Sequence, residues 1–122
     1  MKLHHTVTDH LNQFASYGDG FVSVNDVRYE GSLIVTPDEI REWRPASFEA
    51  LTPDDFAVLL ELKPELVLFG TGKTLRFPHP RLTAALVNAR VGFDAMDTGA
   101  MCRTFNILTA ESRRAVAVVL GA

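Results

Sequence analysis

The spacing of apolar and polar residues predicts β-structure in the first third of the chain. Residues 1–20 are polar and carry turn residues near their end, so we expect a partly ordered segment that closes in a loop. An apolar stretch at residues 21–24 predicts a strand, and residues 27–36 then form the second arm of a hairpin across an Asn-Asp turn. Pro37 ends this arm, and an acidic connecting segment that carries Trp43 follows.

The first helix is predicted to begin after Thr52. Thr52 is a suitable N-cap, Pro53 suits the first helical position, and two aspartates follow where the helix dipole favours negative charge. Pro64 ends the helix. Its apolar stripe has the i, i+3, i+4 spacing of one helix face and consists of Phe56, Leu59 and Leu60.

Three apolar segments in the second half of the chain predict strands that are covered on both faces. They lack the polar alternation of a half-exposed strand and lie at residues 66–69, 91–93 and 115–120. Residues 70–72 turn the chain after the first of them, and residues 75–77 are expected to be extended.

Two further helices separate these strands. The first has an apolar face made of Leu82, Ala85, Leu86 and Ala89. The second begins at a cap provided by Asp97 or Thr98, and its apolar face consists of Met101, Thr104, Phe105 and Leu108. A leading hairpin followed by helices that alternate with buried strands predicts an α/β fold, with layers packed around a mixed sheet.

Length and composition fit a single domain over residues 1–122, with 47% hydrophobic and 22% charged residues. The longest apolar run, residues 115–120, is far shorter than the roughly 20 residues that a membrane-spanning helix needs. The N-terminus has no apolar or arginine-rich targeting segment. Cys102 is the only cysteine, which excludes an intrachain disulfide and a cysteine-based zinc site. We therefore expect a soluble, cytoplasmic protein.

Charge is distributed unevenly along the chain. Residues 1–65 carry twelve acidic and five basic residues, whereas residues 66–122 carry three acidic and seven basic ones. Such an asymmetry indicates either an anion-facing surface on the C-terminal half or two solvated faces of opposite sign. The second interpretation is the simpler one, because runs of charge most often serve solvation.

The segment that follows residues 66–69 ends in the Gly-Lys-Thr of a phosphate-binding P-loop, yet two features exclude that motif. A P-loop needs a glycine at the position of Val67, and its lysine must open a helix, whereas residues 75–77 are predicted to be extended. The dinucleotide-binding fingerprint fails as well, since Leu75 occupies its third glycine position.

A weaker hypothesis remains for the turn at residues 70–72. It lies at the carboxyl end of a central strand, where α/β sheets often bind ligands. The candidate residues for binding a small anion or cofactor are Gly70, Thr71, Gly72, Lys73, Arg76 and Arg103. The alternative is that the glycines only permit the turn.

Other residues give no complete catalytic constellation or metal site. His4, His5 and His10 lack a carboxylate or cysteine partner at a recognised spacing, and no nucleophile elbow is present. Cys102 stands near a helix start and beside Arg103, so a reactive thiolate is conceivable, but packing is the preferred role for a lone cysteine. We expect no enzyme activity, no metal and no cofactor.

Two segments carry a family resemblance. Residues 65–72, with their Leu-Phe-Gly-Thr-Gly, and residues 96–108, continued by 111–113, together resemble a family of small bacterial and archaeal domains. This family includes mitochondrial respiratory complex I assembly factors and the adipogenesis-associated Mth-type domain protein. Arg103, Thr104 and Asn106 match its signature, while Gly99 stands where relatives often carry another small residue.

The resemblance implies a three-layered α/β fold, with a central mixed sheet of about five strands, helices and an additional β-hairpin layer. It implies a bacterial, non-enzymatic interaction domain whose protein partners belong to respiratory or membrane-insertion machinery, with no nucleic acid and at most peripheral membrane contact. The alternative is a small-anion or cofactor-binding domain that uses the turn from Gly70 to Lys73.

Overall fold

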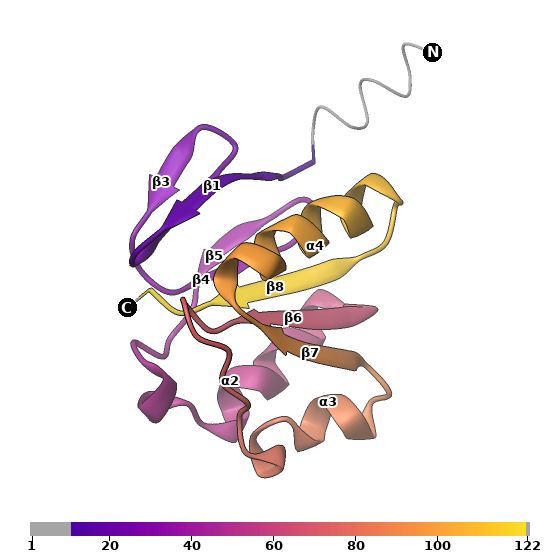
Figure 1. The fold of residues 1–122 in the computed structure, drawn as a ribbon. Helices are drawn as coiled ribbons and strands as arrows, with labels where there is room; N and C mark the ends of the chain where they lie inside the picture. Colours follow the sequence, from indigo (N-terminus) through magenta and orange to yellow (C-terminus); the bar gives the residue numbers. More distant parts are fainter. Residues whose placement is uncertain (1–10, 122) are drawn as a thin grey trace.

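The protein contains two β-sheets, one longer helix and a set of short helices that lie on the opposite side of the larger sheet from the longer helix (Figure 1). The computed structural model describes residues 11–121. The smaller sheet is antiparallel, with strand order β1-β2-β3. Its strands are β1 (Phe14–Gly18), β2 (Phe21–Val24) and β3 (Val27–Tyr29).

The larger sheet is mixed and has the strand order β5-β4-β8-β6-β7. Its strands are β4 (Leu33–Val35), β5 (Ile40–Glu42), β6 (Leu66–Gly70), β7 (Gly92–Met96) and β8 (Ala115–Val119). Strands β7, β6 and β8 are parallel, while β4 pairs antiparallel with both β8 and β5. All five residues of β8 are buried, as expected for a central strand without polar alternation.

Helices cover both faces of the larger sheet (Figure 1). One face packs against α2 (Pro53–Ala57) and α3 (Ala84–Asn88), together with the 3₁₀ turns η1 (Phe48–Ala50), η2 (Val58–Leu62) and η3 (Pro80–Leu82). The other face packs against α4 (Thr98–Ala110) and the smaller sheet. The result is the predicted three-layered α/β fold with a mixed five-stranded sheet.

Each face of the sheet has its own aromatic contacts. On the α2 side, Phe69 lies among Trp43, Phe56 and Phe93 with ring centroids 5.5–6.2 Å apart. On the α4 side, Phe14 meets Phe105 edge to face at 5.2 Å. Such edge-to-face pairs add to the stabilisation from burial alone.

The start of α2 is tied to the segment before it. The carboxylate of Asp55 accepts hydrogen bonds from the backbone N–H and the hydroxyl of Thr52, which is the predicted N-cap. The guanidinium of Arg44 donates to both oxygens of the same carboxylate, each at 2.7 Å. Trp43 donates its indole N–H to the carbonyl of Asp55. The acidic segment before α2 is thereby fixed to the helix.

Several predicted elements differ in the structure. Residues 14–18 form β1 instead of a loop, because their backbone pairs with β2 and their first residue is anchored in the core. The predicted single arm over residues 27–36 is wrong: the chain leaves the smaller sheet after β3 and enters the larger one as β4. Strand β5 occupies the segment expected to be a connection.

The bounds of two further elements differ from the predicted ones. Strand β7 begins and ends later than the predicted 91–93, because it pairs with the whole length of β6. The helix that begins at Pro53 tightens into 3₁₀ geometry over its second half. The expectation of a partly ordered segment over residues 1–20 falls in part on residues 1–10, which lie outside the described residues. Within the described residues, no helix is both long enough and apolar enough to cross a membrane.

Candidate functional site

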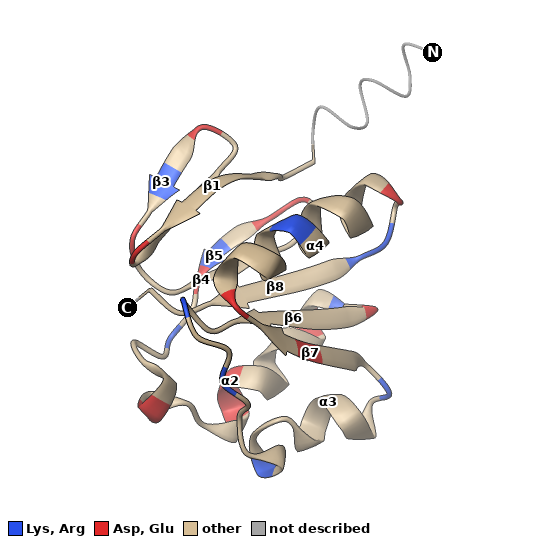
Figure 2. Ribbon diagram, viewed as in Figure 1, with Lys and Arg blue, Asp and Glu red and all other residues tan. Residues whose placement is uncertain are grey.

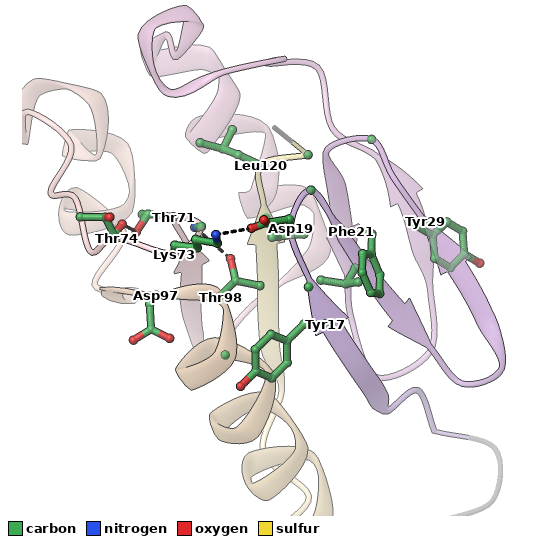
Figure 3. Close-up of a pocket in the computed structure, with 18 of the residues that line it drawn as sticks. Tyr17, Asp19, Phe21, Tyr29, Thr71, Lys73, Thr74, Asp97, Thr98 and Leu120 are labelled. Carbon is green, nitrogen blue, oxygen red and sulfur yellow. Dashed lines mark hydrogen bonds and ion pairs between the residues drawn. The ribbon is translucent and has the colours of Figure 1, made fainter.

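A pocket of about 810 Å³ lies between the two sheets, at the carboxyl end of β6 (Figure 3). One wall is the β1–β2 turn of the smaller sheet. The other is formed by the connection that follows β6 and by the first turn of α4. Its volume lies within the range of roughly 300–1,000 Å³ that is usual for small-molecule sites.

The wall after β6 is held by a reciprocal pair of hydrogen bonds. The N–H of Gly72 donates to the hydroxyl of Thr98 and the N–H of Thr98 donates to the carbonyl of Gly72, both at 2.9 Å. The hydroxyl of Thr71 donates to the carbonyl of Thr74 at 2.8 Å. These bonds fix the loop against the start of α4, so its side chains are presented on a rigid base.

An ion pair joins the two walls (Figure 3). Nζ of Lys73 lies 3.0 Å from Oδ1 of Asp19, which stands in the β1–β2 turn. The side chains are 79% and 73% exposed, so the pair is well solvated. An exposed pair of this kind contributes about 0–1 kcal/mol, and a competing charged group can separate it at little cost.

The wall from the smaller sheet is aromatic. Tyr17 and Phe21 project from β1 and β2, and Tyr29 lies on β3; Leu120, after β8, lines the pocket apart from these rings (Figure 3). The ring of Tyr17 covers the start of α4 so closely that a Cβ at Gly99 would lie 2.6 Å from the tyrosine Oη. The absence of a side chain at Gly99 therefore lets the Tyr17 ring lie against the start of α4.

Four of the predicted ligand-binding residues line this pocket: Thr71, Gly72, Lys73 and Arg76. Gly70 lies behind them, where a Cβ would meet the Met101 side chain at 3.1 Å. Arg103 lies farther along α4 and donates to the phenol oxygen of Tyr17 at 3.4 Å. The structure thus brings most of the candidate set together but leaves Arg103 at the margin.

Arg76 is engaged on the far side of its loop. Its guanidinium donates to Glu49 at 2.9 Å and lies 3.9 Å above the ring of Phe48. The pKa of Glu49 lies below its ordinary value, chiefly because of the hydrogen bond from Arg76. Arg76 therefore serves mainly to hold the loop, which leaves Lys73 as the more available cation.

The pocket residues contributed by the smaller sheet are absent from the sequence-based candidates. The turn at Gly18-Asp19-Gly20 is visible in the sequence as a turn signal, but nothing local indicates that it faces Lys73. Only the packing of β1 against α4 brings the two segments together.

Cys102 is buried within the core on the α4 side of the larger sheet. Burial, the largest effect, raises the pKa of its thiol, while neighbouring Arg103 lowers it and Asp97 raises it. Together these effects raise the pKa to about 12. The structure therefore favours the packing role over the reactive-thiolate alternative.

The acidic N-terminal half and the basic C-terminal half of the chain contact each other through ion pairs. Ion pairs join Lys73 to Asp19, Arg76 to Glu49, Arg113 to Glu65 and Arg114 to Asp38. In each of them, a cation from the C-terminal half meets an acid from the N-terminal half. Figure 2 shows basic and acidic residues interspersed over the fold, which favours solvated and paired charges over one anion-facing surface.

Across residues 11–121, no group of three or more His, Cys, Asp or Glu side chains is placed to hold a metal ion. His79 accepts a hydrogen bond from the N–H of Arg81 through Nδ1, which makes it part of the η3 turn. His4, His5 and His10 lie outside the described residues.

Comparisons with known proteins identify the family. Residues 14–120 match the family described as "Protein of unknown function (DUF498/DUF598)", and the chain belongs to it. Relatives include an "NADH dehydrogenase [ubiquinone] 1 alpha subcomplex assembly factor 3" from Bos taurus, 31% identical over 77% of this chain and 52% of its own length. The Mus musculus protein of the same name is 28% identical over 80% of this chain and 54% of its own. The chain thus spans about half the length of these curated relatives.

Other similar proteins match over nearly their whole length. A "13 kDa major membrane protein" of Francisella tularensis is 23% identical over 88% of this chain and 89% of its own. A Bordetella parapertussis crystal structure is 35% identical with a TM-score of 0.85, covering 92% of this chain and 97% of the other. A Bordetella pertussis solution structure described as a Mth938-like domain is 30% identical with a TM-score of 0.75, covering 92% and 87%.

Proposed function

We propose that this member of the DUF498/DUF598 family is a non-enzymatic interaction domain that helps a multisubunit respiratory or membrane complex to assemble. The similarity to assembly factors of NADH dehydrogenase supports this role. We include in the proposal that residues 1–122 act as one domain of a bacterial cytoplasmic protein. The name of the Francisella relative supports a peripheral contact with a membrane-bound partner.

The structural observation that supports docking is the projecting loop between β6 and η3. Phe77 is 73% exposed, the highest value among the exposed large apolar residues of the part of the chain described. Leu75 on the same loop is 45% exposed. Exposed apolar residues that lie together mark interaction sites more often than single ones do, and aromatic residues are enriched at the centres of protein interfaces.

The loop that carries Phe77 is held in place on both sides of its base. The backbone N–H of Arg76 donates to the Thr71 hydroxyl, and its guanidinium is fixed by Glu49 and the ring of Phe48. Proline follows Phe77 directly and restricts the backbone there. A loop ordered before binding loses less conformational entropy on association, so Phe77 is suited to act as an anchor.

Deletion and complementation in the source organism test this function. We expect loss of the gene to reduce the amount of assembled respiratory NADH dehydrogenase or another membrane complex on native gels. Expression of the wild-type chain should restore it, while Phe77→Ser should not. Ile107→Ser is the matched control, because Ile107 is 58% exposed but lies on α4, away from the loop.

Two results would count against parts of this proposal. If every multisubunit membrane complex stays at its normal level without the protein, the assembly role fails. If assembly is restored equally by wild type and Phe77→Ser, the role stands but the loop is not the docking element.

A further inference from the structure

We propose that the pocket between the β1–β2 turn and the connection after β6 binds an amphipathic monoanion, a carboxylate attached to an apolar body. In this arrangement Lys73 leaves Asp19 to bind the carboxylate at the mouth, and the apolar body lies against the aromatic wall. This binding activity goes beyond the assembly role and does not depend on it.

The shape and lining of the pocket support an apolar body. About 810 Å³ is room for a chain or ring of drug-like size. Tyr17, Phe21 and Tyr29 line the pocket on the side of the smaller sheet, where Arg28 lies over one face of the Phe21 ring, and Leu120 lines it after β8. Aromatic and aliphatic surfaces of this extent gain free energy when they cover an apolar ligand instead of water.

The charges at the mouth support a single negative group. Lys73 is paired only through an exposed contact, so exchanging the Asp19 carboxylate for a ligand carboxylate preserves the charge pairing. Two other cations lie near the pocket: Arg76 is already engaged by Glu49, and Arg28, which lies over the Phe21 ring, by Glu30. Asp19 and Asp97 also line the pocket and would repel a ligand with several negative charges. A di- or triphosphate is therefore repelled more strongly than a monocarboxylate.

Gly31 is a second, independent position at which a substitution can test the pocket. It lies in the chain segment between β3 and β4, lines the pocket, and has no atom within 4 Å of the place where a Cβ would stand. Its backbone is outside the positive-φ region that favours glycine. A larger side chain at this position can therefore be accommodated by the fold, and because Gly31 lines the pocket we expect it to reduce the space for a ligand.

The test uses octanoate as the probe, with octan-1-ol, octylammonium and inorganic phosphate as comparisons. Binding is followed by backbone amide NMR shifts during titration and by the shift in melting temperature. We expect octanoate to bind most tightly, octanol more weakly and octylammonium and phosphate not at all. The shifted amides should lie in the β1–β2 turn and in residues 71–74.

Four variants locate the binding. Lys73→Met should weaken octanoate binding about five- to tenfold, the loss of one charge-assisted hydrogen bond, and leave octanol binding unchanged. Asp19→Asn should strengthen octanoate binding, because it removes the competing carboxylate. Gly31→Leu should weaken both probes. Arg41→Met removes another surface ion pair, Arg41 with Glu39, whose side chains are 48% and 43% exposed, and is expected to change neither.

Three results would overturn the proposal. One is the absence of octanoate binding, and another is amide shifts confined to a different surface. The third is an affinity that stays the same in Lys73→Met or falls in Asp19→Asn. Because Asp19→Asn is expected to gain affinity, damage to the fold cannot imitate the supporting result.

Discussion

The side-chain amide of Asn106 on α4 forms two hydrogen bonds with the backbone of Phe14 at the start of β1. Its oxygen accepts from the N–H of Phe14 and its nitrogen donates to the carbonyl of the same residue, each at 2.9 Å. The pair joins residues 92 positions apart and fixes the base of the smaller sheet to α4. Two signature residues, Asn106 and Arg103, thus contact β1, the second through Tyr17.

Replacing Asn106 by alanine should loosen the smaller sheet. The change removes both bonds and leaves the partly buried backbone groups of Phe14 without their partner, at a cost of about 1–3 kcal/mol. Urea unfolding should show the loss of stability, and amide hydrogen exchange should show faster exchange in β1 and β2. Asn88→Ala on the exposed side of α3 is the control and should stay within about 0.5 kcal/mol of wild type. Equal effects of the two variants would contradict this account of Asn106.

The ion pair of Arg44 with buried Asp55 should make stability depend on pH. Burial raises the pKa of Asp55, but hydrogen bonds from Arg44 and Thr52 outweigh it, so the pKa lies below its ordinary value of 3.8. A carboxyl group with a lowered pKa in the folded state stabilises the fold above its unfolded pKa. That stability is lost as pH falls through the folded value.

Arg44→Met isolates this contribution. At pH 7 we expect it to lower the free energy of unfolding, since it removes a hydrogen-bonded charged partner of the buried Asp55 carboxylate. The difference between variant and wild type should shrink as the pH of the urea titration is lowered from 7 towards 3. A difference that is constant over this range would show that Asp55 is not the group responsible.

Gly99→Ala should be coupled to Tyr17. Alanine favours a helix over glycine by up to about 1 kcal/mol, but its Cβ would meet the Tyr17 ring, which must move. We therefore expect Gly99→Ala to stabilise the Tyr17→Ala variant more than it stabilises the wild type. A double-mutant cycle from thermal or urea unfolding measures this coupling. Strict additivity of the two changes would contradict the close contact.

Cys102 should be unreactive in the native protein. With a thiol pKa of about 12, roughly one thiol in ten thousand is ionised at pH 8, and the sulfur is buried. A colorimetric thiol reagent should label the native protein only as fast as it opens, and should label it at once in urea. Labelling within seconds under native conditions would indicate an accessible thiolate.

The elements that the sequence predicts correctly are those determined by residues close together in the chain. The cap and start of α2, the buried face of α4 and the apolar strands β6 and β8 all follow from residue spacing and capping chemistry. These features were predictable because the residues that determine them lie within one or two turns of each other.

What the sequence does not predict depends on partners far along the chain. Strand β1 is polar and exposed apart from Phe14, so its strand character comes from pairing with β2 and from Asn106. Residues 27–36 are interrupted by Gly31-Ser32, which is a turn signal, but only the packing of the two sheets decides that the chain changes sheet there. Likewise, Lys73 and Thr71 are visible as candidates in the turn, whereas their neighbour Asp19 is brought there by the fold.

Photo-crosslinking from position 77 tests the proposed interaction role most directly. A photoreactive phenylalanine analogue replaces Phe77 in the source organism, and the same analogue at Ile107 is the control, since both side chains are largely exposed. The account predicts a crosslink from position 77, absent from position 107, to a subunit or assembly protein of a multisubunit membrane complex. No crosslink from position 77, or the same products from both positions, would contradict it.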